Sequence, residues 1–131
     1  MKKEAIQTSQ APAPIGPYSQ AIRCGSLLFV SGQVALIPGT DNELDNASIE
    51  QETHRVLKNL DAILTAAGLG FGSIVKTTIF LSDMALFGKV NEIYAGYFEA
   101  GAVYPARETV AVKGLPKNVQ VEISVIAAYQ D

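Results

Sequence analysis

The sequence predicts an α+β fold in which two helices cover one face of a five- or six-stranded sheet. Segments rich in β-branched residues alternate with two segments whose apolar residues recur every three or four positions, which gives the order β-β-α-β-α-β-β. A chain of 131 residues is long enough for one domain, 1–131, that buries roughly two-thirds of the surface its unfolded form would expose.

The first third of the chain is expected to contain an arm and a hairpin. Residues 1–17 include three prolines and predict an irregular N-terminal arm. Residues 18–24 and 27–34 have the composition of strands, and the Gly25–Ser26 pair between them is typical of a tight turn. Together they predict a β-hairpin.

Two helices are expected to flank the third strand. The first should begin at Ser48, because Ser48 and Gln51 fit a capping box, and should end at Gly68. A β-branched run predicts a strand at about 74–81, and a second apolar stripe predicts a helix over about 86–99.

The last two strands carry the most informative charge in the chain. Residues 106–113 and 119–129 are predicted to pair as an antiparallel hairpin, which would place Arg107 on the same face as Glu122 and Ser124. One interpretation is a cross-strand ion pair of little energetic consequence. The other is a site for a ligand carboxylate, because a guanidinium group can bind a carboxylate through two parallel hydrogen bonds.

The sheet face without helices is expected to be buried against another copy of the chain. Apolar residues occupy successive positions in several strands, as at Leu27, Leu28 and Phe29, whereas a sheet with one wet face usually alternates. The sequence therefore predicts a homo-oligomer.

Composition argues against several function classes. The net charge is −3 and the ten Lys and Arg residues are scattered, so a basic surface for nucleic acid is not expected. A single cysteine, Cys24, permits neither an internal disulfide nor a multi-cysteine metal site. Because neither a signal-like segment nor an apolar run of 18 residues is present, we expect a cytoplasmic protein without a membrane span.

Six motifs, in order, resemble those of the Rid family of enamine and imine deaminases, also called the YjgF family. They lie at residues 16–21, 31–33, 76–84, 90–94, 105–107 and 115–123. The resemblance covers nearly the whole chain, and the chain looks like a member of the branch of reactive intermediate deaminase A, because Arg107 and Glu122 stand where that branch has them.

The resemblance implies a chorismate-mutase-like fold that assembles as a homotrimer with a central barrel-like core and with sites in the clefts between subunits. It also implies that Arg107 holds the substrate carboxylate and that Glu122 orients or activates the attacking water. The other positions that match residues of the family cleft are Tyr18, Ser31, Gly32 and Asn91.

The activity implied is hydrolysis of 2-aminoacrylate, 2-aminocrotonate and their imino tautomers to 2-oxo acids and ammonia. Pyridoxal-phosphate-dependent dehydratases release these enamines from serine and threonine. Water addition to an imine needs a positioned base and a fixed electrophile, so neither a cofactor nor a metal is expected.

Alternative interpretations of these residues remain. Tyr18 can be a turn-edge aromatic, Ser31–Gly32 a bulge, and Asn91 a helix-surface residue that only forms hydrogen bonds. Glu108 and Thr109 stand where many family members have Ser and Cys, which favours a water mechanism over a cysteine nucleophile. The alternative functions are an RNA-acting translation inhibitor and a non-catalytic module that senses 2-oxo acids or binds proteins.

Overall fold

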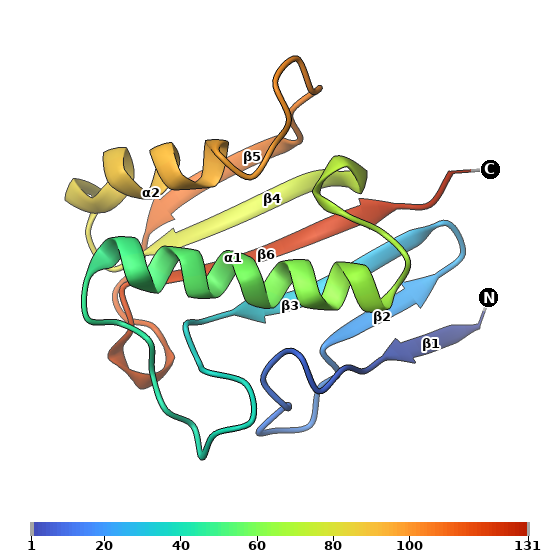
Figure 1. Ribbon diagram of the computed structural model, residues 1–131, viewed down its shortest axis with the longest axis horizontal. Helices are drawn as coiled ribbons and strands as arrows, with labels where there is room; N and C mark the ends of the chain where they lie inside the picture. Colours follow the sequence, from blue (N-terminus) through green and yellow to red (C-terminus); the bar gives the residue numbers. More distant parts are fainter. Residues whose placement is uncertain (1, 131) are drawn as a thin grey trace.

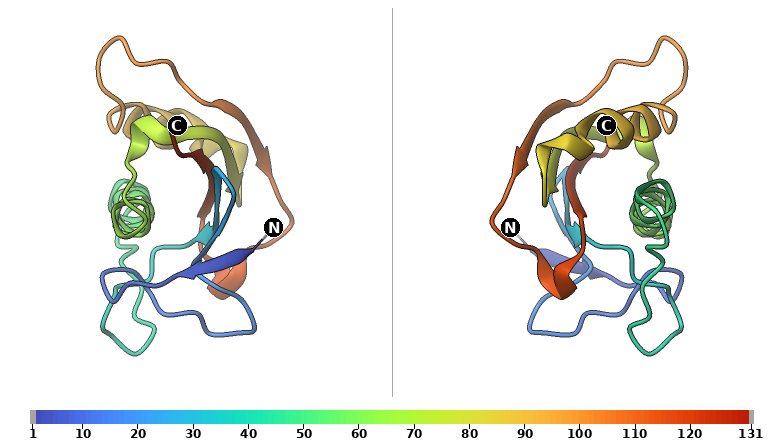
Figure 2. Two further views of the ribbon diagram at one scale, coloured as in Figure 1. Left: turned by 90° about the vertical axis from the view of Figure 1, so that its right-hand side faces the viewer. Right: turned by 90° about the vertical axis from the view of Figure 1, so that its left-hand side faces the viewer.

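The computed structural model describes residues 2–130 and confirms the predicted fold class: two helices pack on one face of a mixed six-stranded sheet (Figures 1 and 2). The strand order is β1-β2-β3-β6-β4-β5, and all neighbours are antiparallel except β4 and β5. The elements are β1 (Lys3–Ile6), β2 (Ala21–Cys24), β3 (Leu27–Gln33), α1 (Ile49–Ala66), β4 (Ile74–Leu81), α2 (Phe87–Ala95), β5 (Ala106–Ala111) and β6 (Val121–Ala128).

Helix α1 begins and ends where the sequence predicts. The Ser48 hydroxyl accepts the backbone N–H of Gln51 at 3.0 Å, which is one half of a capping box. The Gln51 side chain does not complete the box, because it binds the Asp45 carboxylate instead. At the other end, Gly68 takes φ = +80° and the Leu69 N–H returns to the Leu64 carbonyl at 2.8 Å, an arrangement that closes the last turn.

The core lies between α1 and the central strands. Burial in β6 alternates strictly, so that Val121, Ile123 and Val125 face the helices. They pack with the buried stripe of α1, where each fully buried Leu or Ile side chain contributes about 1.5–3 kcal/mol. Strand β3 alternates as well: Leu28 is buried, whereas Leu27 and Phe29 face the side without helices.

The N-terminal arm contains a strand that the sequence did not predict. Residues Lys3–Ile6 form β1 and pair with β2 at the sheet edge, with Lys3 opposite Cys24. The prolines that indicated an irregular arm begin only at Pro12, so the backbone N–H groups of residues 3–6 are free to join the sheet. Helix α2 is also shorter than predicted, ending at Ala95 before the Gly96 cap.

The predicted hairpin of the last two strands is wrong. Strand β6 lies between β3 and β4, while β5 lies at the edge and runs parallel to β4. Lys117 and Asn118, both with positive φ, turn the connection between β5 and β6. The more apolar β6 thereby occupies a central position, where β3 and β4 pair with its two edges and the core covers one of its faces, and β5 takes the edge.

This topology reverses the predicted relation between the two charged residues. Arg107 of β5 lies opposite Thr77 of β4, and Thr77 in turn lies opposite the core residue Val125 of β6. Glu122 lies opposite Phe80 of β4, and both side chains point to the face of the sheet without helices. Arg107 and Glu122 therefore point to opposite faces of the sheet, and the shared face that was expected from a hairpin is wrong.

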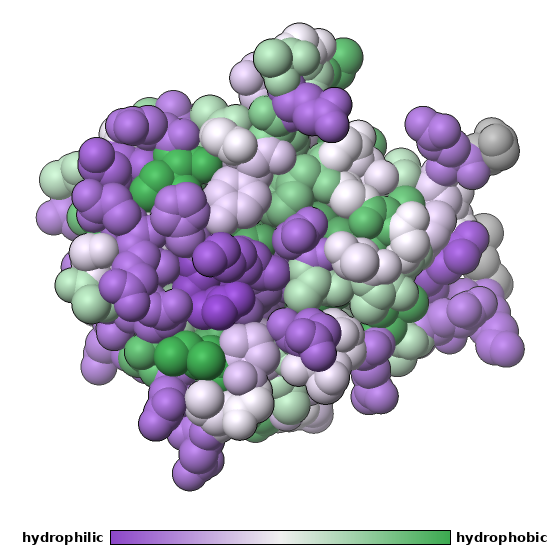
Figure 3. Space-filling model, viewed as in Figure 1, coloured by the Kyte–Doolittle hydropathy of each residue, from purple (hydrophilic) through white to green (hydrophobic). Residues whose placement is uncertain are grey.

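The outer surface of the helices is mainly polar. Hydrophilic side chains predominate over α2 and the first half of α1 (Figure 3). Within residues 2–130, no helix combines the length and apolar character needed to cross a membrane.

Candidate functional site

Arg107 extends from the edge strand β5 toward α2. Its Nη1 donates a hydrogen bond to Asn91 Oδ1 at 2.6 Å, and its guanidinium carbon lies 5.3 Å from the Tyr94 ring centroid and 5.6 Å from that of Phe87. Among the described residues, no carboxylate forms an ion pair with it. The predicted ion pair with Glu122 is therefore absent from this part of the chain, and the guanidinium can bind an external anion.

A cavity of about 400 Å³ opens beside this guanidinium. Its size is suitable for a small organic acid. The Tyr94 hydroxyl donates to Thr77 Oγ1 at 2.9 Å, which fixes one wall, and burial raises the pKa of this phenol so that it stays neutral. The lining residues, which we call the Arg107 group, are Asn91, Tyr94, Ala95, Tyr104, Pro105 and Arg107.

Glu122 lies on the other face of the sheet, over the backbone of Gly32. A Cβ atom at Gly32 would lie 2.4 Å from Glu122 Oε2, so this approach requires a glycine. The carboxyl group is half-buried, and burial raises the pKa of Glu122 above its ordinary value. A carboxyl group with a raised pKa can exchange a proton closer to neutral pH than an exposed one.

The segment before β2 runs beside this carboxyl group. The Ser31 hydroxyl donates to the Ser19 carbonyl at 2.6 Å, and the Ser31 N–H donates to the Gln20 carbonyl at 3.0 Å. The register of β3 shifts between Val30 and Gln33, so the bulge interpretation of Ser31–Gly32 is confirmed. Ser31, Gly32 and Glu122 form a second cluster, the Glu122 group. Tyr18, which is 51% exposed, directly precedes Ser19, the acceptor of the Ser31 hydroxyl.

The two groups do not meet within one chain. Arg107 and Glu122 are two strands apart and offset by three residues along them. With strands about 4.8 Å apart and a rise of about 3.3 Å per residue, their Cα atoms are about 14 Å apart, on opposite faces. The structure thus brings Asn91 to Arg107 and Gly32 to Glu122, but it does not bring the two sets together.

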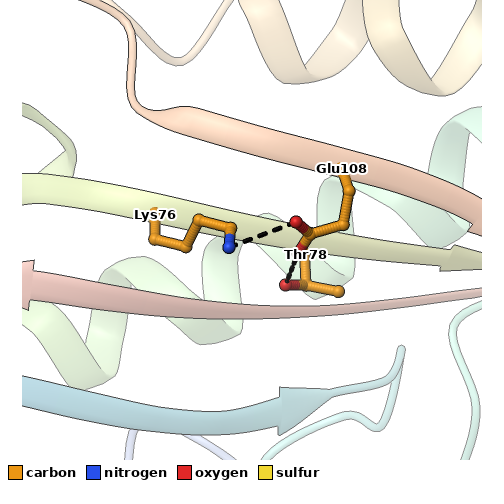
Figure 4. A network of polar contacts seen from close by, with 3 residues as sticks. All are labelled: Lys76, Thr78 and Glu108. Carbon is orange, nitrogen blue, oxygen red and sulfur yellow. Dashed lines mark hydrogen bonds and ion pairs between the residues drawn. The ribbon is translucent and has the colours of Figure 1, made fainter.

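Glu108 faces away from Arg107, as the strand alternation predicts. It reaches across to β4 on the face without helices, where it pairs with Lys76 at 3.1 Å and accepts a hydrogen bond from Thr78 (Figure 4). The hydrogen bond from Thr78 and the contact with Lys76 lower the pKa of the Glu108 carboxyl. Glu108 is therefore no part of the Arg107 cavity.

Sequence reasoning missed one residue of the Arg107 group and one buried acidic residue. Tyr104 lines the cavity, and its position directly before the Pro105-Ala106-Arg107 motif was an available signal. Glu52 is buried beneath β6, and its place four residues before Val56 of the apolar stripe would have indicated this. No set of three or more His, Cys, Asp or Glu residues within 2–130 is arranged to hold a metal ion.

Solved structures with this fold are similar to the chain over nearly all its length. A protein of the Rid family from Yersinia pestis superposes with a TM-score of 0.92 at 49% identity, covering 97% of this chain and 99% of that one. Escherichia coli TdcF, solved with bound serine, gives a TM-score of 0.90 at 41% identity and the same coverage. The fold is therefore that of the YjgF and Rid proteins.

Sequence comparison shows the family directly. Residues 8–129 match the family described as endoribonuclease L-PSP, and the chain belongs to this family, which is the Rid or YjgF family that the motifs indicate. A chloroplastic protein of Arabidopsis thaliana named reactive intermediate deaminase A is 50% identical over 127 residues. That match covers 97% of this chain and 66% of the plant protein.

Proposed function

We propose that the chain is a deaminase that hydrolyses 2-aminoacrylate, 2-aminocrotonate and their imino tautomers to 2-oxo acids and ammonia. The observation that carries this proposal is the guanidinium of Arg107, which faces a cavity of about 400 Å³ without an acidic partner among the described residues. The name of the Arabidopsis relative supports the reaction type, and the serine bound to TdcF supports a ligand with an α-carboxylate.

Arg107 binds the substrate carboxylate in this proposal. Asn91 holds one guanidinium nitrogen at 2.6 Å and leaves the other N–H groups for a two-bond contact with the ligand. The rings of Phe87 and Tyr94 lie beside the guanidinium and restrict its orientation. Binding of the substrate carboxylate to Arg107 fixes the distance between the guanidinium and the imine carbon.

The complete site requires two chains. A four-carbon acid held by Arg107 cannot reach Glu122 of the same chain, because the two side chains leave opposite faces of the sheet. We propose that the face without helices packs against further copies in a homotrimer, so that the Arg107 group of one subunit meets the Glu122 group of the next. The exposed apolar side chains of Leu27, Phe29 and Val110 on that face support such packing.

Glu122 handles water in the proposed reaction. The enamine first tautomerises to the imine; water then adds to the imine carbon while the Glu122 carboxylate accepts a water proton. Proton transfer to nitrogen and cleavage of the C–N bond release ammonia and leave the carbonyl group. One imine and one water thus give one 2-oxo acid and one ammonia. Dehydratases that use pyridoxal phosphate would supply the substrate.

Replacement of Arg107 tests the proposal. In an assay coupled to threonine dehydratase, purified Arg107→Ala should accelerate 2-oxobutanoate formation about 100-fold less than the wild type does. The acceleration by Arg107→Lys should lie between those two values. Arg23→Ala is the matched control, because Arg23 contacts the Tyr129 ring at 3.8 Å away from the cavity.

Other outcomes would support other functions. An undiminished rate with Arg107→Ala contradicts the carboxylate role. Saturable binding of 2-oxobutanoate without any rate enhancement by the wild type would favour a sensing module. Salt-dependent binding or cleavage of RNA by the purified protein would favour the RNA-acting alternative.

A further inference from the structure

Of the three buried polar side chains of α1, two bond to backbone groups outside the helix. Glu52 is 1% exposed and Asn59 is fully buried. They are seven residues apart, two helical turns, and so lie on the same side of the helix. Neither residue lines the Arg107 cavity, so the carboxylate-binding half of the proposed site does not explain them.

Glu52 holds the start of β6. Its Oε2 accepts the backbone N–H of Gln120 at 2.7 Å and that of Val121 at 3.0 Å. The Gln120 carbonyl, in turn, accepts the Ser82 N–H at 3.0 Å. The backbone is therefore held from α1 and from the end of β4 at the two residues directly before Glu122.

Asn59 holds the chain just beyond β3. Its Nδ2 donates to the Val34 carbonyl at 3.2 Å and to the Leu36 carbonyl at 2.9 Å. The adjacent Gln33, also buried, donates from Nε2 to the Ser31 carbonyl at 3.2 Å. These bonds hold the end of the bulge that contains Gly32.

We propose that Glu52 and Asn59 are positioning residues, which clamp the start of β6 and the end of β3 so that the Glu122 carboxyl group lies over Gly32. The clamp explains why α1 carries buried polar side chains at positions 52 and 59, which lie next to the strand ends that bear the Glu122 group. The contribution of this clamp to catalysis rests on the proposed deaminase function, whereas the position of Glu122 can be measured without it.

The carboxylate of Glu52 suits this task better than an apolar residue. One oxygen accepts two neighbouring N–H groups at the strand start, of which that of Val121 is buried and that of Gln120 is partly buried. Its position in the first turn and a half of α1 also places the negative charge near the positive end of the helix dipole. The carboxylate is therefore accommodated without a basic partner among residues 2–130.

Four substitutions separate positioning from general stability. Glu52→Ala removes both acceptor contacts, and Glu52→Gln keeps an acceptor oxygen at the same reach. The control is Thr53→Ala, because Thr53 is also buried in α1 but its hydroxyl bonds only to the Ile49 carbonyl of the same helix, at 2.7 Å. Glu52→Asp, one methylene shorter, replaces Glu52→Ala if the latter does not fold.

The primary measurement is the pKa of the Glu122 carboxyl group by carbon-detected NMR. In Glu52→Ala, and to a smaller extent in Glu52→Asp, it should move back toward the ordinary value as β6 loosens and water reaches the carboxyl group. In Glu52→Gln and Thr53→Ala it should stay at the wild-type value. A folded Glu52→Ala or Glu52→Asp variant with an unchanged Glu122 pKa would overturn the proposal.

The second measurement is steady-state kinetics. Glu52→Ala should lower kcat about 10-fold and leave KM within about twofold, because the Arg107 group is untouched. Glu52→Gln should restore kcat to within about threefold of the wild type. A rise in KM with unchanged kcat would contradict the clamp. If the wild type itself does not accelerate hydrolysis, the proposed function fails, and the NMR titration still decides whether Glu52 positions Glu122.

Discussion

The Arg107 group and the Glu122 group differ in how the fold holds them. Arg107 leaves an edge strand, is exposed, and is oriented by one hydrogen bond and two aromatic rings. Glu122 leaves a central strand, is half-buried, and lies against a glycine within a bulge. The Arg107 group is thus open to a ligand, whereas the Glu122 group is built into a constrained part of the sheet.

This contrast fits the demands of the two proposed tasks. A guanidinium group binds a carboxylate by adjusting within an open cavity, and its charge does not depend on its surroundings. A carboxyl group that moves protons needs a fixed distance to the reacting atom and a pKa set by partial burial. The difference predicts that mutations of the Glu122 group act mainly on kcat, and those of the Arg107 group mainly on kcat/KM.

The largest effect in the Glu122 group is expected from Glu122→Gln. The amide cannot accept a proton from water, so kcat should fall about 1,000-fold, within the range typical of general-base loss, while KM changes little. Single-turnover measurements with 2-iminobutanoate generated in the assay would check this. A kcat within threefold of the wild type would remove Glu122 from the mechanism.

An intermediate effect is expected from Gly32→Ala. The new Cβ would lie 2.4 Å from Glu122 Oε2, and because this oxygen is the end of a flexible side chain, the carboxyl group should move while the fold persists. We expect kcat to fall about 30-fold, with Tm within a few degrees of the wild type. Gly72→Ala is the control, since its Cβ would meet no atom within 4 Å.

The smallest effect concerns stability and pH. Burial raises the pKa of Glu122 above 4.5, so the folded chain holds this proton more tightly than the unfolded chain. The stability that protonated Glu122 contributes is therefore complete below the pKa of this group in the unfolded chain, and it is lost as the pH rises through the pKa in the folded chain. Glu122→Gln should raise Tm by about 2 °C at pH 7.5 and by nothing at pH 4, given solvent screening of a half-buried group. Equal shifts at both pH values would contradict this.

The sequence predicted the elements of the fold better than their pairing. The cap at Ser48 and the stop at Gly68 follow from local chemistry, and the structure confirms them. The place of β6 between β3 and β4 does not follow from local chemistry, because a connection as short as 112–120 suits a hairpin as well as a step across a neighbouring strand. Which strand takes the central position depends on the packing and pairing of the whole sheet.

The same limitation applied to the candidate site. Arg107, Asn91 and Glu122 were identified from residue types and motifs, and Arg107 with Asn91 proved to be in contact. The shared face of Arg107 and Glu122 was derived from a pairing that does not exist. The burial of Glu52 could have been predicted from the apolar stripe, but its hydrogen-bond partners could not, because they are backbone N–H groups 68 and 69 residues away.

The central claim is that Arg107 of one chain and Glu122 of another act on the same substrate. Arg107→Ala and Glu122→Gln, each inactive alone, should be unfolded together, refolded as a 1:1 mixture, and assayed for 2-oxobutanoate formation. Random assembly of trimers would leave about a quarter of the sites with both native residues, so activity should return to about a quarter of the wild type. A mixture of Arg107→Ala with the double variant should stay inactive. No recovery in the first mixture, from subunits shown to have mixed, would contradict a site shared between chains.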